Sequence, residues 1–226
     1  MNIKKKQIRF DFLSIFPNSL DNYFNSSIIK RAQEKKIVVI NKYNIRDNTN
    51  DKHKTVDDVP YGGGPGMILK IEPIYKTLKK IYPKKNKSTR IILLTPRGKT
   101  FNQNKVKKLS KYKRLILIAG HYEAIDARID KFIDEKISIG NFILTGGELG
   151  AGIIIDSVSR IIPGVIGKLE SLKEESFSEY NKKTKKFNIE YPQYTRPGVF
   201  KNLKVPKVLL SGHHQKIKKW RENHSK

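Results

Sequence analysis

Three glycine-containing turns are the segments of this sequence whose residue types best suit a ligand site. They lie at residues 94–98 (Leu-Thr-Pro-Arg-Gly), 119–123 (Ala-Gly-His-Tyr-Glu) and 139–148, and the first two directly follow apolar runs typical of buried strands. Ligands of open α/β sheets bind at the carboxyl ends of strands, and glycine lets backbone groups approach a ligand closely. We therefore expect the three turns to meet around one nucleotide-like cofactor. The alternative is that each glycine only permits a tight turn.

A fourth glycine-rich segment follows two adjacent carboxylates. Asp57 and Asp58 precede Val-Pro-Tyr and then a run rich in glycine at residues 62–66. Such a backbone can wrap around a ligand, and the carboxylates can orient basic side chains or bind the edge of a nucleobase.

Familiar cofactor motifs are missing. The pair Gly98-Lys99 resembles the end of a P-loop, but Leu93 stands where that loop needs its first glycine, and no Gly-x-Gly-x-x-Gly follows a strand.

The elements that must position these turns alternate along the chain. Strands are predicted at 8–16, 37–43, 91–94, 115–119 and 136–144, and helices at 20–35, 73–82, 102–111, 125–134 and 148–162. Continuous apolar runs in the strands favour a sheet that is covered on both faces. The alternation therefore predicts an α/β domain around a mainly parallel sheet.

Charge and composition narrow the function classes. The 226 residues include 47 Lys and Arg against 21 Asp and Glu, a formal net charge of +26, which favours a polyanionic partner such as nucleic acid. A codon bias toward lysine would produce part of the same excess. The absence of Cys excludes disulfide scaffolds, Cys-ligated metal sites and cysteine nucleophiles, and the 5 His residues lack metal-ligand spacing. Since neither a signal peptide nor a run of roughly 20 apolar residues is present, we expect a cytoplasmic protein with no membrane contact.

The character of the chain changes after residue 167. Residues 168–186 are highly charged and short of apolar side chains, which is typical of a mobile linker between domains. The last stretch, 187–226, is too small to build a core of its own. We therefore expect a main domain over 1–167 and a small, incomplete and mainly helical domain over 187–226.

Taken together, the motifs resemble those of the bacterial tRNA (guanine-N1)-methyltransferases, a family of the SPOUT superfamily of knotted methyltransferases. The matching stretches run in order through most of the chain, at residues 15–17, 44–47, 57–67, 95–99, 120–123, 138–148, 156–165, 176–177, 190–197 and 205–214. Each match is short, but their common order over about 200 residues makes coincidence a poor explanation.

The resemblance implies a reaction, a fold and an assembly. Such enzymes transfer a methyl group from S-adenosylmethionine to N1 of the guanine at tRNA position 37, beside the anticodon, and Mg²⁺ is a further candidate cofactor. The α/β domain over 1–167 would end in a trefoil knot, an exception to the rule that chains stay unknotted. The enzyme would be a homodimer in which the partner subunit completes each site, and 187–226 would be a shortened tRNA-binding domain.

The resemblance also implies roles for individual residues. Glu175 stands at the position of the family's general base, and Arg160 matches its functional arginine. These two would remove the N1 proton of guanine and stabilise the charge that builds on the neighbouring oxygen. The implied cofactor-binding residues belong to the three glycine turns: Leu94, Thr95, Pro96, Gly98, Gly120, His121, Tyr122, Glu123, Ser138, Ile139, Gly140, Asn141, Phe142, Ile143, Leu144, Gly146 and Gly147. The implied substrate-binding residues are Asp57, Asp58, Tyr61, Gly63, Gly64 and Arg196.

The sequence departs from the family pattern at several of these positions. The family has Asp where Glu175 stands, Arg where His121 stands, Gly where Ala124 stands, and Asp-Tyr at 141–142. It also continues past Arg221 with a basic helical tail. Two other functions therefore stay open: an RNA-binding protein of the same fold with weakened catalysis, and a related SPOUT enzyme that acts on another RNA.

Overall fold

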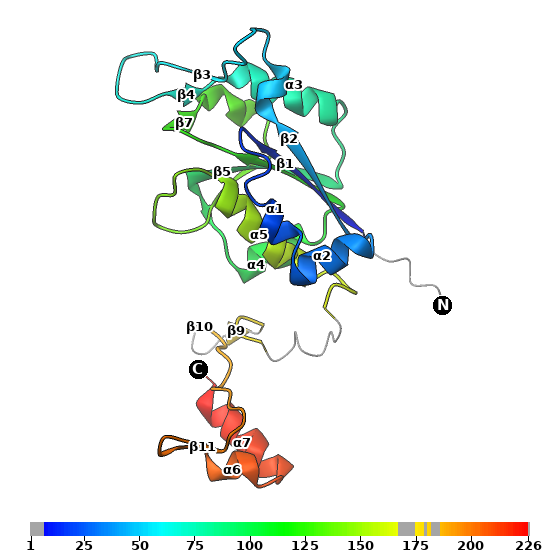
Figure 1. Cartoon of the computed structure of the whole chain (residues 1–226), viewed down its shortest axis with the longest axis vertical. Helices are drawn as coiled ribbons and strands as arrows, with labels where there is room; N and C mark the ends of the chain where they lie inside the picture. The colour runs from blue at the N-terminus through cyan, green and yellow to red at the C-terminus, as the bar shows by residue number, and fades with distance from the viewer. Residues whose placement is uncertain (1–6, 167–174, 179, 182–185, 226) are drawn as a thin grey trace. The chain divides into compact units, whose positions relative to one another are not determined.

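The structure is a computed structural model that describes residues 7–166, 175–178, 180–181 and 186–225 (Figure 1). The chain divides into two compact units, residues 1–167 and residues 168–226. Much of the linker predicted at 168–186 lies outside the described residues. The two units are described in turn.

A five-stranded sheet forms the centre of the first unit (Figure 1). All neighbouring strands are parallel and their order is β2-β1-β6-β5-β8, with bounds β1 Ile8–Ser14, β2 Val38–Asn44, β5 Thr89–Thr100, β6 Arg114–Ala119 and β8 Glu135–Ser138. Successive residues of a strand enter opposite cores: Leu117 of β6 joins one apolar cluster and Ile118 the other. Because both faces of the sheet are covered, successive residues of these strands are apolar in the sequence. The predicted α/β class is confirmed.

Helices form a layer on each face of this sheet (Figure 1). One face packs against α1 (Asp21–Phe24), α2 (Ser27–Glu34), α4 (Gln103–Leu109) and α5 (Glu148–Arg160). The other packs against α3 (Ile71–Ile81) and two short 3-10 helices, η1 (Ile45–Asn48) and η2 (Ala127–Lys131). The carboxyl ends of the strands are left to the loops that carry the predicted site.

Two of the predicted helices are wrong in detail. The single helix expected at 20–35 is broken into α1 and α2 because Ser26 is extended and Ser27 has a φ of 47°. The helix expected at 125–134 is instead the short strand β7 (Ala124–Ile125) followed by η2. There the Asp126 side chain accepts a hydrogen bond from the Arg128 backbone, and Phe132 N bonds to Ile129 O three residues back, so a single tight turn forms.

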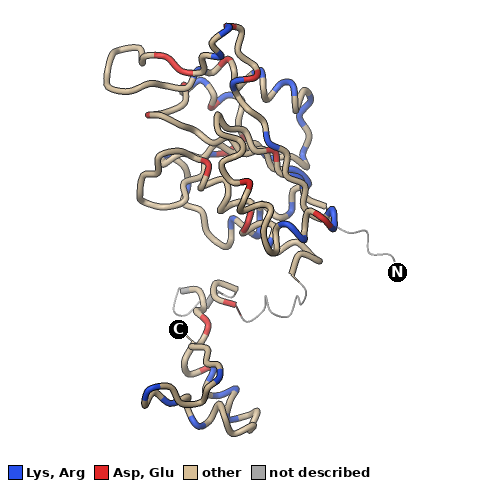
Figure 2. The backbone as a smooth tube through the Cα atoms, viewed as in Figure 1, with Lys and Arg blue, Asp and Glu red and all other residues tan. Residues whose placement is uncertain are grey.

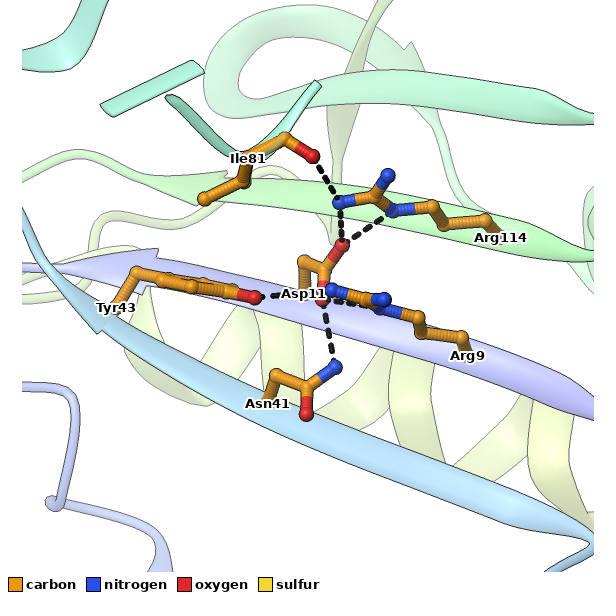
Figure 3. A network of polar contacts seen from close by, with 6 residues as sticks. All are labelled: Arg9, Asp11, Asn41, Tyr43, Ile81 and Arg114. Atoms are coloured by element: carbon orange, nitrogen blue, oxygen red, sulfur yellow. Dashed lines mark hydrogen bonds and ion pairs between the residues drawn. The ribbon is translucent and has the colours of Figure 1, made fainter. Parts of the chain in front are cut away.

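A buried carboxylate ties three strands of the sheet together (Figure 3). Asp11 of β1 is 0% exposed, and its Oδ1 accepts hydrogen bonds from Arg9 Nε at 2.8 Å and Asn41 Nδ2 at 2.9 Å. Arg114 of β6 donates to its Oδ2 and also to the backbone oxygen of Ile81, at 2.9 Å, where α3 ends. Burying a charge is costly unless it is paired and hydrogen-bonded. This network therefore favours one register of β1 between β2 and β6.

The second unit is small and open. Its described elements are the strand pairs β9 (Tyr180–Asn181) with β10 (Lys186–Phe187) and β11 (Val199–Phe200) with β12 (Leu203–Lys204), and the helices α6 (Lys207–Leu210) and α7 (His214–His224). Within residues 187–225, all of which the structure describes, no residue is buried. None of the helices in the described part of either unit is long and apolar enough to span a bilayer.

Candidate functional site

The three glycine turns meet at the carboxyl edge of the sheet. Leu94 of β5 is paired with Ala119 of β6 on one side and with Ile137 of β8 on the other, so the turns that follow these strands start side by side. Gly147 N then donates a hydrogen bond to Gly120 O at 2.7 Å, which joins the third turn to the second. The structure thus brings together the three segments that the sequence pattern singled out.

The first turn interrupts β5 beside β8. Ile137 is the ladder partner of both Leu94 and Lys99, so residues 95–98 leave the ladder and return to the same point. A Cβ atom added to Gly98 would lie 2.4, 2.5 and 2.6 Å from the backbone N, C and Cα of Ile137. Real Cβ atoms do not approach backbone this closely. Glycine is therefore required at Gly98 by the packing of one backbone on another.

The third turn presses its backbone against the second in the same way. A Cβ added to Gly147 would lie 2.9 Å from both Ala119 Cα and Gly120 N. A Cβ added to Gly120 would meet its first neighbours, side-chain carbons of Ile125, at 3.5 Å, which is ordinary contact. The edge is thus built from closely spaced backbone, and Gly120 is the position among these three glycines where a Cβ would meet only ordinary contacts.

A polar cluster that the sequence pattern did not reveal lies at the second turn. Glu148, the first residue of α5, is buried, and its carboxylate accepts a hydrogen bond from Ser14 Oγ of β1 at 2.5 Å. Its other oxygen lies 3.7 Å from His121 Nδ1, a buried atom that has no hydrogen-bond partner among the described residues. The ring of Phe16 packs edge-on against His121 at 5.0 Å. The signal that could have pointed to Glu148 is its place in the first turn of a helix, where a carboxylate is stabilised by the helix dipole.

The loop between β8 and α5 exposes apolar side chains. Ser138 Oγ donates to Gly140 O at 3.0 Å, which closes the start of the loop. Phe142 is 55% exposed and Ile143 79% exposed, and Asn141 is exposed beside them. The extended segment predicted at 136–144 therefore ends at Ser138, and the rest of it is this loop.

An ion-pair network holds the strand that leads into this loop. Glu135 opens β8 and accepts hydrogen bonds from Arg90 Nε of β5 at 3.1 Å and from Lys105 Nζ of α4 at 2.6 Å. Burial acts to raise the pKa of this carboxyl, but the hydrogen bonds and charges of Lys105 and Arg90 outweigh it and hold the pKa below its usual range. The network fixes β8 beside β5, where the first and third turns begin.

The glycine-rich loop, residues 59–67, is anchored next to the second turn. It joins β3 (Asp57–Asp58) to β4 (Ile68–Leu69), and β4 pairs with β7, which follows the turn at 120–123. Glu123 N also donates to Met67 O at 3.2 Å. Tyr61 at the loop is fully exposed, and Gly63 and Gly64 have φ values of 78° and 120°, which favour glycine. The structure therefore places the predicted substrate residues of this loop beside the predicted cofactor turns.

The two predicted catalytic residues lie in different units. Arg160 is the last residue of α5 in the first unit and is partly buried. Glu175 is in the second unit, where its backbone oxygen accepts hydrogen bonds from Ser178 N at 3.1 Å and Asn188 Nδ2 at 3.0 Å. Arg196, the remaining predicted substrate residue, lines a groove of the second unit. Among the residues that the structure describes, no group of three or more His, Cys, Asp and Glu is placed to hold a metal ion.

Comparison with known proteins gives a consistent picture. The family model described as tRNA (Guanine-1)-methyltransferase TrmD matches residues 8–226. A tRNA (guanine-N(1)-)-methyltransferase of Clostridium tetani is 52% identical over 217 residues, which are 96% of this chain and 87% of that protein. A protein of the same name from Clostridioides difficile is 50% identical over 220 residues, 96% of this chain and 92% of its own length.

A solved structure is also similar over most of the chain. The crystal structure of tRNA (m1G37) methyltransferase from Aquifex aeolicus has a TM-score of 0.77 and 38% sequence identity, and the match covers 96% of this chain and 89% of that one. The likeness therefore extends across both units of the chain.

Proposed function

This chain belongs to the tRNA (guanine-1)-methyltransferase family. From that membership we propose which residues bind the methyl donor, hold the target base and catalyse the transfer. The protein is an enzyme that methylates N1 of guanine in tRNA, at position 37. Membership in a methyltransferase family implies S-adenosylmethionine as the methyl donor. The observation that carries the assignment is the match of the family model from residue 8 to residue 226. It favours this activity over the alternative of a related enzyme acting on another RNA.

The glycine turns have the features that a bound nucleoside needs. Leu94 and Ile139 both lie 3.5 Å from the position of a Cβ on Gly150, so apolar side chains of the first and third turns pack together against α5. Gly120 has no side chain that would keep a ligand away from the backbone, and the packed backbone at Gly98 and Gly147 keeps that edge rigid. When bound, S-adenosylmethionine supplies an electrophilic methyl group. We therefore assign residues 94–98, 120–123 and 138–147 as its site.

The excursion of residues 95–98 beside Ile137 supports a further proposal about the fold. In a trefoil knot the chain is threaded through a loop of itself, so segments that are far apart in the sequence come into close contact. Gly98 and Ile137 provide that contact. We propose that this contact belongs to the knot.

Catalysis requires a base and an electrostatic partner. Guanine N1 carries a proton at neutral pH, so a carboxylate must accept that proton before or during methyl transfer. We assign this role to Glu175, because a glutamate carboxylate can accept a proton as a general base. Arg160 would stabilise the charge that develops on the neighbouring guanine oxygen. The glycine-rich loop, with Asp57, Asp58 and Tyr61, would hold the target base beside the methyl donor.

The proposal extends to assembly, metal and location. Leu149 and Ile153 lie one turn apart on α5 and are 57% and 46% exposed, and the preceding loop adds the exposed Phe142 and Ile143. Exposed apolar side chains that gather in this way mark interaction surfaces. We propose that a second copy covers them in a homodimer, with each site completed by its partner.

Mg²⁺ would bind through one or two carboxylates and tRNA phosphates, as this ion commonly does. The enzyme would act in the cytoplasm.

The domains follow the two units. Residues 1–167 would be the methyltransferase domain, residues 168–186 the connection, and residues 187–226 part of a tRNA-binding domain. The basic character of residues 186–226 supports this division, because lysine and arginine contacts to phosphates supply most of the affinity of proteins for nucleic acids.

One incubation tests the function. The purified chain is mixed with S-adenosylmethionine labelled in its methyl group and with two tRNA transcripts that differ only at position 37, guanine or adenine. We expect label in the guanine transcript alone, recovered as 1-methylguanosine after digestion. Label at another nucleoside would refute the proposed chemistry. RNA binding without any labelling would favour the alternative of an RNA-binding protein with lost catalysis. Omission of Mg²⁺, with a chelator present, tests the metal in the same assay.

A further inference from the structure

The second unit contains a groove of about 410 Å³, and Arg196 is the predicted substrate residue that lines it. Its lining includes Tyr191, Tyr194 and Arg196, together with Leu209, Ile217 and Arg221 of the helical part. Its volume falls in the range of small-ligand sites, about 300–1,000 Å³. All of the lining residues lie between 191 and 221, so the groove belongs to this unit alone.

Aromatic rings are gathered at this groove. Trp220 of α7 contacts Tyr191 and Tyr194 edge-on, with ring centroids 6.3 Å and 6.2 Å apart. The guanidinium of Arg221 lies 4.9 Å from the centre of the Tyr191 ring. Tyr194 is 49% exposed, so much of its ring remains open to a ligand. Edge-on packing holds a ring in place while leaving its face free for stacking.

The charge around the groove is strongly positive. In the sequence from 186 to 226 the acidic residues are Glu190 and Glu222, against many Lys and Arg (Figure 2). Gln193 Nε2 donates a hydrogen bond to Glu190 at 2.5 Å, and Arg196 and Arg221 both line the groove. Open aromatic rings beside arginines match a nucleobase joined to a phosphate, because every base stacks on an aromatic face and guanidinium groups bind phosphate oxygens.

We propose that this groove binds one unpaired nucleotide of the tRNA substrate. The base stacks on Tyr194 against the apolar wall formed by Leu209 and Ile217, and its phosphate lies at Arg196 and Arg221. The inference rests on the proposed function, since that function supplies RNA as the partner of this chain. It goes further by assigning a specific site and the unpaired state of the nucleotide, because only a base released from pairing offers its face to a ring.

Trp220 reports on this groove directly, because it is the single tryptophan of the chain and contacts both tyrosines. The full chain is titrated at constant salt with a single-stranded pentaribonucleotide, with a blunt RNA duplex, and with adenosine monophosphate. We expect saturable quenching by the single strand and at least about 10-fold weaker binding of the duplex and the mononucleotide. Equal binding of single strand and duplex, or no fluorescence change with the single strand, would overturn the proposal. Binding of the mononucleotide as tight as that of the strand would assign the groove to a free nucleotide and overturn the RNA occupant.

Variants connect the groove to the tRNA. Tyr194→Ala should raise the Kd for the single strand and the KM for tRNA by about 10-fold, with kcat within twofold, because stacking contributes to binding and not to chemistry. Tyr194→Phe keeps the ring and should behave as the parent does. Phe200→Ala is the matched control, since Phe200 is 60% exposed in the same unit but does not line the groove. Far-UV circular dichroism establishes that each variant is folded, and Arg221→Gln replaces Tyr194→Ala should the latter lose helicity.

The outcomes separate this inference from the proposed function. If the parent methylates tRNA while Tyr194→Ala and Arg221→Gln keep the parental KM, the function stands and the groove assignment fails. If the parent methylates no tRNA but the single strand quenches Trp220 and Tyr194→Ala abolishes the quenching, the groove binds RNA and the failure lies in the proposed function.

Discussion

Replacing Gly98 by alanine should destabilise the first unit severely. The added methyl carbon would lie 2.4–2.6 Å from three backbone atoms of Ile137. Comfortable carbon contacts are at about 3.5 Å or more, so β5 and β8 would have to separate by about 1 Å. Forcing extra atoms into a packed site typically costs about 1–3 kcal/mol and occasionally more, and here the neighbour is backbone, which cannot move aside as a side chain can. We therefore expect a loss of about 3 kcal/mol or more.

Thermal unfolding followed by far-UV circular dichroism measures this loss. At about 2–4 °C per kcal/mol for a chain of this size, the Tm of Gly98→Ala should fall by about 6–12 °C or further. Gly120→Ala is the control, because its new methyl would meet Ile125 carbons at an ordinary 3.5 Å. Its Tm should stay within about 4 °C of that of the parent. A Gly98→Ala protein that melts within 2 °C of the parent would refute the account of β5 packed backbone-to-backbone on β8.

The remaining predictions concern catalysis, pH, salt and assembly. Glu175→Gln should lower kcat by a factor on the order of 10² while Glu175→Asp keeps activity, and full activity of the Gln variant would remove the residue from the role of base. The control Glu190→Gln should keep the parental kcat. Since the folded pKa of Glu135 is held below its ordinary value of 4.5, its contribution to stability is present above that pH and is lost as the pH falls through the folded pKa. The difference in unfolding free energy between parent and Glu135→Gln should therefore shrink below about pH 4.5, and a constant difference would contradict the ion-pair account. The logarithm of tRNA affinity should fall linearly with the logarithm of salt concentration, and a flat dependence would exclude phosphate contacts as the main source of affinity. Ile153→Asp should convert a dimer into a 26.1 kDa monomer in sedimentation, whereas a parent that sediments as a monomer would refute the dimer.

Local sequence patterns predicted much of the fold. The apolar runs at 91–94 and 115–119 lie in parallel strands of the central sheet because both of its faces are buried, and such strands need no alternation. The glycine turns that follow these runs stand at one edge, since the carboxyl ends of parallel strands point the same way. The motifs around those turns were specific enough to indicate the family, which the comparisons confirmed.

Tertiary structure alone decided the contacts between segments that are far apart in the sequence. Glu148 accepts a hydrogen bond from Ser14, and Gly98 packs on Ile137, although neither pair is marked by any local pattern. The break between α1 and α2 and the short η2 turn were also outside local prediction. Helical spacing in a sequence shows that a segment can form a helix, but side-chain hydrogen bonds such as the one that Asp126 accepts from Arg128 N decide where a helical turn begins.

The groove of the second unit shows the same division. Residues 190–197 were recognised by their motif, yet the motif did not show that Tyr194 and Arg196 line one groove with Ile217 and Arg221. The net charge of a segment is the sum of the charges of its residues and does not depend on how they are arranged in space. The sequence alone therefore established the positive charge of this unit. A binding surface depends on which side chains face each other across space, and the chain determines that only when it folds.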